Sequence, residues 1–148
     1  MEGINSENIK YLSPKEAEDL GESPQHHFDL FVNEKKVGSA EIDYFSKPLP
    51  LYQLTDLYVD FDLKGKGYAS KILDKVEKFL IERRKPGLLV DAIIAGDPAS
   101  TLYSKRGWKE VPNGNGLRVF NWPENVSLDI LSGYFWRYTD ILERKDNI

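Results

Sequence analysis

The feature that most constrains the fold is a long amphipathic helix set between two runs typical of strands. A helix is predicted from Gly67 to about Lys85, because apolar residues recur at helical spacing on one face and charged residues occupy the other. A strand is predicted before it at Gln53–Val59, and the nearly continuous apolar run Leu88–Ala95 is typical of a strand covered on both faces. This order predicts a right-handed strand–helix–strand crossover in a mixed α/β domain.

Shorter elements precede this crossover. Alternating residues predict strands at Phe28–Val32 and Val37–Phe45, joined by a polar turn. A further strand is expected at Ile9–Leu12, followed by a short helix capped by Ser13 with Pro14 in its first turn. The domain is therefore expected to begin with strands that lie antiparallel to one another.

The elements after the crossover are predicted to extend the sheet and to end in a helix. Asp97, followed by a proline, predicts the start of a helix that ends near Gly107. Segments 108–111 and 117–122 flank an Asn-Gly-Asn-Gly sequence, which is a hairpin signal. An apolar stripe predicts an amphipathic helix over residues 126–143. Its predicted buried residues are Leu128, Leu131, Phe135 and Tyr138.

Composition excludes several classes of function. The 148 residues suit one domain, and 41% hydrophobic with 30% charged residues is an ordinary globular mixture. Because cysteine is absent, disulfides, thiolate metal sites and cysteine nucleophiles are excluded, and with only two histidines we expect no metal site. The net charge of −4 disfavours nucleic acid as a partner. No apolar run approaches the roughly 20 residues that span a membrane, and the start lacks a signal-peptide core, so we expect a cytoplasmic protein without a membrane partner.

The candidate chemistry lies in the loop that leads into the long helix. Gly65 and Gly67 have no Cβ, so backbone N–H groups there can approach an anion closely. The first amides of the following helix lack internal partners, and the helix dipole adds partial positive charge. Lys64 and Lys66 add formal charge. These residues predict a phosphate-binding loop, while the alternative of glycines that only permit a tight turn stays open.

Two other nucleotide-binding patterns fit less well. The chain has no G-x-x-x-x-G-K-[ST] sequence, which excludes a P-loop. Residues 65–70 imitate the G-x-G-x-x-G of dinucleotide-binding folds, and Asp91 stands about 20 residues on. The third glycine is replaced by Ser70, however, and strands already precede this unit, where a dinucleotide fold would begin.

Two segments together resemble the GNAT superfamily of N-acetyltransferases. Residues 64–69, Lys-Gly-Lys-Gly-Tyr-Ala, fit the family's acetyl-CoA loop pattern [QR]-x-x-G-x-[GA], with lysine at the first position. Residues 96–108 resemble its N-x-x-A-x-x-L-Y-x-K-x-G-[FW] segment, and the resemblance covers about residues 26–122. It implies a GNAT acyltransferase fold with a mixed sheet in a single domain. Its parts would be a shortened N-terminal region at 1–24, an acetyl-CoA-binding core at 25–122 and a C-terminal helix at 123–148.

The resemblance implies acetyl-CoA as the cosubstrate. Its pyrophosphate would lie on the amides of Lys64–Ala69, and its pantetheine arm would pair with the strand edge near Leu57–Val59. Gly96 stands where the family often has an asparagine that bonds the pantetheine, and Asp97 beside it is the substitute, although a helix cap explains Asp97 equally well. The residues assigned to the cofactor are Leu57, Tyr58, Val59, Lys64, Gly65, Lys66, Gly67, Tyr68, Ala69, Ser70 and Asp97.

The resemblance also implies direct transfer from the thioester to an amine, with a tyrosine as general acid and a carboxylate as general base. Tyr103 matches the family tyrosine that protonates the departing thiolate, and an aromatic packed beside Trp108 is the alternative. Many relatives place a glutamate where this chain has Gln53, which cannot act as a base. Asp56 on the same strand and Glu41 on the preceding one are the substitutes, and for each the alternative is a solvated strand carboxylate.

The predicted function is transfer of an acetyl group to a primary amine of a small-molecule or protein acceptor. One alternative is a CoA-binding regulatory module without catalysis, which Gln53 favours. Another is an interaction module that uses the aromatic segment Tyr134–Tyr138. A monomer or a homodimer is expected.

Overall fold

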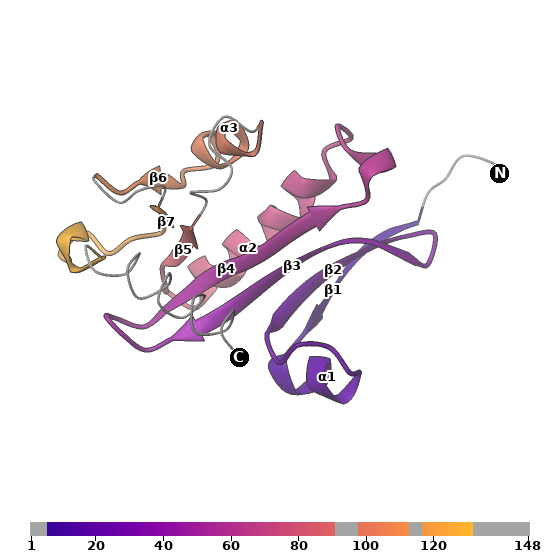
Figure 1. The fold of residues 1–148 in the computed structure, drawn as a ribbon, viewed down its shortest axis with the longest axis horizontal. Helices are drawn as coiled ribbons and strands as arrows, with labels where there is room; N and C mark the ends of the chain where they lie inside the picture. Colours follow the sequence, from indigo (N-terminus) through magenta and orange to yellow (C-terminus); the bar gives the residue numbers. More distant parts are fainter. Residues whose placement is uncertain (1–5, 91–97, 113–116, 132–148) are drawn as a thin grey trace, which may run out of the picture.

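Within residues 6–90, 98–112 and 117–131, which the computed structural model describes, seven strands form one mixed sheet (Figure 1). Neighbouring strands are antiparallel except for β4 and β5, which run parallel. In spatial order the strands are β1 (Glu7–Leu12), β2 (His26–Val32), β3 (Lys35–Phe45), β4 (Leu51–Val59), β5 (Gly87–Val90), β7 (Leu117–Phe120) and β6 (Lys109–Glu110). The mixed α/β class predicted from the sequence is confirmed.

Helices occupy the connections between these strands. α2 (Tyr68–Glu82) joins β4 to the parallel β5 and lies behind β4 in the view of Figure 1. α1 (Pro14–Asp19) connects β1 to β2, and α3 (Pro98–Lys105) precedes β6. Two short 3-10 turns, η1 (Phe61–Leu63) and η2 (Leu128–Leu131), precede α2 and follow β7. Among the described helices, none has both the length and the apolar character needed to cross a membrane.

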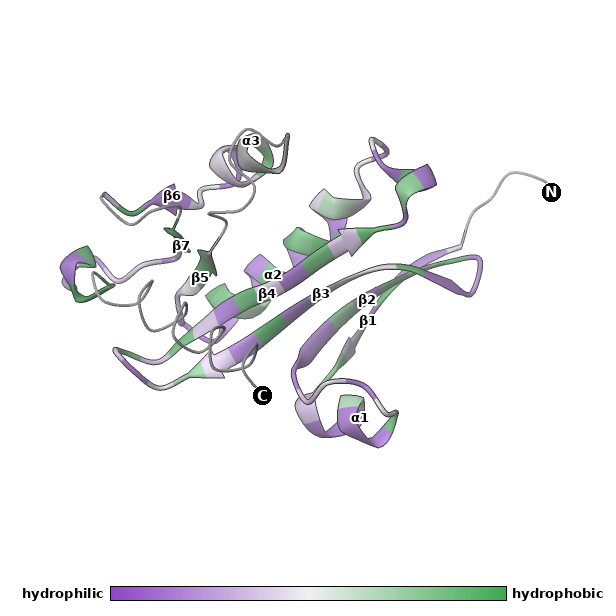
Figure 2. Ribbon diagram, viewed as in Figure 1, coloured by the Kyte–Doolittle hydropathy of each residue, from purple (hydrophilic) through white to green (hydrophobic). Residues whose placement is uncertain are grey.

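The main hydrophobic core lies between α2 and the sheet. Ile72, Leu73 and Val76 of α2 are fully buried, because their helical spacing places them on one face. They pack with alternate strand residues such as Ala40 and Leu54, and Figure 2 shows the resulting alternation of green and purple along β3 and β4. Burial stabilises the fold by roughly 1.5–3 kcal/mol for each large side chain before entropy is counted.

The long helix begins and ends near the predicted residues, but its C-terminus is earlier. Gly67 is its N-cap and Arg83 its C-cap, so the last residue of the helix is Glu82 rather than Lys85. Arg84 adopts a left-handed conformation with φ 54°, and its N–H donates to the Ile81 carbonyl. The Lys85 N–H donates to the Leu80 carbonyl, which completes a Schellman motif. Glycine usually occupies the left-handed position of this motif, so an arginine there gives no stop signal in the sequence.

The shorter strands and helices lie close to the positions predicted for them from the sequence. The strand predicted at Ile9–Leu12 is confirmed as β1, and Ser13 caps α1 with a full capping box in which Ser13 and Glu16 exchange hydrogen bonds. Of the apolar run Leu88–Ala95, β5 covers the part up to Val90, and residues 91–97 lie outside the described part. The predicted hairpin is present as β6 and β7, although its turn at 113–116 also lies outside it.

A second core on the opposite face of the sheet includes the start of the C-terminal segment. Leu51 and Leu88 pack there with Leu131, which is fully buried as predicted. Leu128 is half-buried against this cluster, but residues 126–127 are not helical and Leu128–Leu131 is a 3-10 turn, so the prediction of an α-helix is wrong over residues 126–131. Residues 132–143, with Phe135 and Tyr138, lie outside the described residues.

Candidate active site

The first component of the site is the part of β4 that continues beyond its pairing with β5. The two strands pair over Tyr52–Leu54, and β4 then runs on to Val59 while still paired with β3 on its other side. Among the described residues, no strand pairs with the β5-facing edge of β4 beyond Leu54. A strand edge without a partner strand can offer its backbone donors and acceptors to an extended ligand. Leu57–Val59, predicted to pair with the pantetheine arm, lie on this edge.

A bulge at Thr55 marks the point where β4 leaves β5. Glu41 of β3 is opposite Asp56, whereas Ile42 is opposite Leu54, so Thr55 is the extra residue. Its hydroxyl donates to the Glu41 carbonyl oxygen at 3.2 Å. Because one residue is inserted, Asp56 and Tyr58 lie on the face of the sheet away from α2, while Leu57 and Val59 pack toward the α2 core.

The second component is the glycine-containing loop at the end of β4. Gly65 and Gly67 have φ of 84° and 81°, in the left-handed region that favours glycine. A Cβ at either position would meet no atom within 4 Å, so these positions face open space. No side chain caps α2, and its first amides, those of Tyr68–Ser70, have no acceptor within the helix. The loop thus presents uncapped backbone donors at the positive end of a fifteen-residue helix.

The lysine side chains of this loop are exposed and add positive charge at its surface. Lys64, Lys66 and Gly67 are exposed, and the Lys64 ammonium lies 5.6 Å from the ring centre of Phe61, which is 87% exposed. The Tyr68 side chain is buried in the main core, so only its backbone can serve a ligand here. Ala69 and Ser70 are half-buried in the first turn of α2, and Asp97 lies outside the described residues.

The third component is a pair of carboxylates on the bulged strands. Glu41 and Asp56, the two predicted substitutes for the general base, are directly opposite each other on the face away from α2. The side chain of Glu41 is 25% exposed, and that of Asp56 is exposed. Burial raises the pKa of Glu41, the nearby His27 lowers it, and the Asp56 carboxylate raises it. The structure therefore brings together the two candidates that the sequence left separate.

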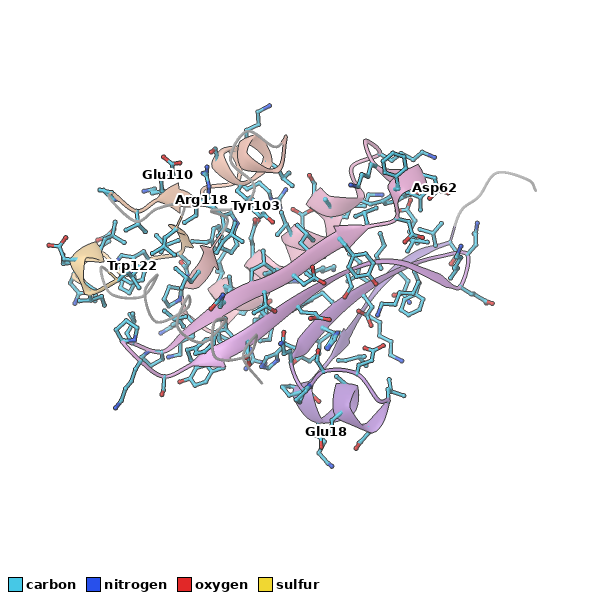
Figure 3. The ribbon with its side chains drawn as sticks, in the orientation of Figure 1. Glu18, Asp62, Tyr103, Glu110, Arg118 and Trp122 are labelled. Atoms are coloured by element: carbon cyan, nitrogen blue, oxygen red, sulfur yellow. The ribbon has the colours of Figure 1, made fainter. Side chains whose placement is uncertain are left out.

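Tyr103 is a buried residue of α3. It is 3% exposed and packs edge-to-face on Trp108, with 5.9 Å between the ring centroids. In Figure 3 it lies on the side of α3 that faces the sheet. It belongs to the α2-side core, whereas Glu41 and Asp56 lie on the other face. The packing beside Trp108 that the alternative required is present, and the role of Tyr103 as the acid stays a prediction.

An ion-pair cluster that the sequence analysis did not identify fastens α3 to α2. Glu77 accepts hydrogen bonds from Arg106 Nε and Nη2, both at 2.8 Å, and from Trp108 Nε1 at 2.9 Å. Arg106 also pairs with Asp74, and the hydrogen bonds to Glu77 raise the pKa of Arg106. Arg106 and Trp108 directly follow α3, so this cluster fixes the helix that carries Tyr103.

Gln53 and His27 complete the face opposite α2. Gln53 is buried, consistent with a structural amide rather than a base. His27 is 2% exposed, and its ring lies among three carboxylates, those of Glu22, Asp29 and Glu41. The signal in the sequence was the alternation of His27 and Asp29 with Phe28 and Leu30, which places both polar side chains on one face.

The fold and this arrangement define an acyltransferase-like mixed α/β domain, and comparisons with known proteins identify its family. The family model described as acetyltransferase (GNAT) domain matches residues 2–121. The chain therefore belongs to the GNAT acetyltransferase family. No curated protein gives a significant match.

Solved structures of GNAT proteins have the same fold. One is the GNAT family N-acetyltransferase YhbS from Escherichia coli in complex with CoA, with a TM-score of 0.58, 16% identity, and coverage of 80% of this chain and 83% of that one. AtaTR bound with acetyl-CoA has a TM-score of 0.57 and 16% sequence identity, with coverage of 77% of this chain and 92% of that one. The PaiA N-acetyltransferase from Thermoplasma acidophilum in complex with CoA has a TM-score of 0.54 and 17% sequence identity, with coverage of 65% of this chain and 60% of that one.

Proposed function

We propose that this protein transfers an acetyl group from acetyl-CoA directly to a primary amine. The observation that carries the proposal is the uncapped N-terminus of α2, which begins at Gly67 in open space and lies at the end of the β4 edge. Membership of the GNAT family and the CoA or acetyl-CoA named in three of its structural neighbours support an acyl-CoA as the ligand of this loop.

The cofactor would bind mainly through backbone groups. The amides of Tyr68–Ser70 would hold the pyrophosphate, with Lys64 and Lys66 adding charge at the loop surface. The pantetheine amides would pair with the β4 edge at Leu57–Val59, in the manner of an added strand. This path ends near the Thr55 bulge, so the thioester would lie where β4 leaves β5.

The chemistry then requires a base, a stabilised oxyanion and an acid. Glu41 or Asp56 removes a proton from the acceptor ammonium, and the free amine nitrogen attacks the thioester carbonyl carbon. A backbone N–H of β4 stabilises the oxyanion of the tetrahedral intermediate. The C–S bond breaks, the hydroxyl of Tyr103 protonates the departing thiolate, and the proton that the nitrogen loses as the neutral amide forms returns to the tyrosinate. Since the chain has no cysteine, no acyl-cysteine intermediate can form.

The charge of this face supports an amine as the acceptor. A primary amine is protonated at neutral pH, and the opposed carboxylates of Glu41 and Asp56 would attract a cation before the base deprotonates it. The acceptor side would therefore be the sheet face away from α2, and the cofactor would approach along the β4 edge.

Thiol release from acetyl-CoA in the presence of a panel of primary amines tests this function. The absence of cysteine removes any thiol background from the protein itself. We expect release that depends on the amine, with the acetylated amine detected by mass spectrometry. Binding of acetyl-CoA without amine-dependent release from any amine would instead support a regulatory CoA-binding module.

A pair of matched variants then identifies the base. Glu41→Gln and Asp56→Asn each neutralise one member of the opposed pair without changing its size. We expect Glu41→Gln to give the larger loss of kcat, because burial raises the pKa of the Glu41 carboxyl and so makes its carboxylate the stronger base. Equal activity of both variants and the wild type would remove both residues from the reaction.

A further inference from the structure

The buried histidine His27 lies beside Glu41, the candidate base, with 3.6 Å between His27 Nδ1 and Glu41 Oε1. His27 Nε2 lies 2.9 Å from the carbonyl oxygen of Ser23 in the loop before β2. A carbonyl oxygen can only accept a hydrogen bond, so Nε2 carries a proton. If the ring is neutral, Nδ1 is then unprotonated and carries a lone pair.

The surroundings of Nδ1 favour a proton on this atom over an unprotonated lone pair. The nearest charged atoms are carboxylate oxygens, with Glu22 Oε2 at 3.5 Å, Glu41 Oε1 at 3.6 Å and Asp29 Oδ1 at 4.0 Å. His27 Nδ1 and Glu22 Oε2 are both buried without a hydrogen-bond partner among the described residues. A lone pair facing three anions in a buried site is repulsive, whereas a proton on Nδ1 turns each contact into an attraction.

Of the three carboxylates around the His27 ring, Glu22 and Asp29 also pair with Lys36, whereas Glu41 has its close cationic contact with His27. The Lys36 ammonium lies 3.5 Å from Glu22 Oε1 and 3.4 Å from Asp29 Oδ1. Asp29 also accepts a hydrogen bond from the Ser39 hydroxyl at 2.6 Å. Among the described residues, His27 is the one cationic group within 4 Å of the Glu41 carboxylate. On its other side Glu41 faces Asp56, an anion that opposes its ionisation.

We propose that His27, protonated on both ring nitrogens, is a positioning residue that keeps the Glu41 carboxylate ionised and oriented as the base of the transfer reaction. The inference rests on the proposed function for the identity of the reaction, and the charge state of His27 can be measured without it. Glu41 lies between His27 and the β4 bulge, so the imidazolium acts through Glu41 and does not itself reach the acceptor.

Removing the positive charge should change the pH dependence in a defined direction. The ionised base is the active form, so kcat/KM rises with pH through the ionisation of Glu41. Burial raises the pKa of Glu41, and of the two groups that lower it, His27 has the larger effect and Lys36 the smaller. Loss of His27 therefore leaves the lowering by Lys36 opposed by burial and by the carboxylates of Asp56 and Glu22, which all raise the pKa. The acid limb of the profile should therefore move to higher pH in His27→Asn, with a loss of about tenfold in kcat/KM on the acid side and a smaller loss above the limb.

The chain offers a matched control in its other histidine. His26 is the neighbour in sequence, but it points to the opposite face, where its Nδ1 lies 2.7 Å from the Tyr11 hydroxyl and its ring packs near Phe79. His26→Asn should leave the acid limb unchanged. A change in amplitude without movement of the limb in His27→Asn would mean that His27 is only structural, and the proposal would be overturned.

Nitrogen-15 NMR of the wild-type protein tests the charge state directly and needs no turnover. With two histidines in the chain, His26→Asn assigns the signals. We expect both ring nitrogens of His27 to be protonated at pH 7, in the presence or absence of EDTA. A neutral ring overturns the proposal. So does a ring that changes on adding EDTA or zinc chloride, which would identify a cation held by the Glu22, His27 and Asp29 atoms, all within 4.8 Å of one another. Wild-type protein with this NMR signature but without transferase activity would refute the proposed function alone.

Discussion

The cluster around Glu77 gives a prediction whose size follows from the structure. Glu77→Ala removes the acceptor of two hydrogen bonds from Arg106 and of one from the Trp108 indole. Trp108 is 1% exposed, so its N–H would be left buried and unpaired, at a cost of about 1–3 kcal/mol. Arg106 would lose its bidentate partner but keep Asp74, which is 64% exposed and a weak partner in water.

The sum of these effects is a loss of about 3 kcal/mol in the free energy of unfolding, at the low end for breaking a buried pair. Urea denaturation followed by tryptophan fluorescence measures it. The matched control is Glu82→Ala on the same helix, whose ion pair with Lys78 is 3.9 Å long and exposed, and which should cost under about 0.5 kcal/mol. A loss below about 1 kcal/mol in Glu77→Ala would refute the reasoning that this cluster fixes α3.

Two further predictions concern Tyr103 and the C-terminal turn. Tyr103→Phe keeps the ring against Trp108 but removes the hydroxyl, so kcat should fall about 10²-fold with little change in acetyl-CoA affinity; an intact kcat at every pH would show that the hydroxyl is not the acid. Leu131→Ala should lower the free energy of unfolding by about 2–4 kcal/mol because Leu131 is fully buried in the second core, whereas Ile130→Ala, at a site 40% exposed, should cost far less; equal losses would contradict the docking of this turn.

The parts of the fold predicted from sequence are those with a local signal. The period of α2 and the helix cap at Ser13 are each determined by residues close together in the chain, and the structure confirms both. The C-terminus of α2 was predicted too late, because its left-handed residue is Arg84 rather than a glycine. The loop at Gly65 and Gly67 was also predicted from local residues, and both glycines adopt left-handed conformations, while its binding of phosphate stays a prediction.

The parts that sequence reasoning missed depend on contacts between distant strands. Glu41 and Asp56 face each other only because the Thr55 bulge shifts the register of β3 against β4, and no local pattern encodes that shift. His27 meets Glu41 through the pairing of β2 with β3, and Glu22 arrives from the loop after α1. A histidine in an alternating strand indicates which face it occupies, but not the three carboxylates it meets there.

Acetyl-CoA affinity at the N-terminus of α2 tests the central claim most directly. Gly67 and Gly21 have φ of 81° and 79°, and a Cβ at either site would meet no protein atom within 4 Å. Alanine at the two sites therefore introduces the same backbone strain, but only Gly67→Ala places a methyl group where the pyrophosphate would approach. By calorimetry we predict that Gly21→Ala binds acetyl-CoA like the wild type and that folded Gly67→Ala binds at least about tenfold more weakly, or about 1.4 kcal/mol. Equal affinity in all three proteins would contradict the assignment of this loop to the cofactor.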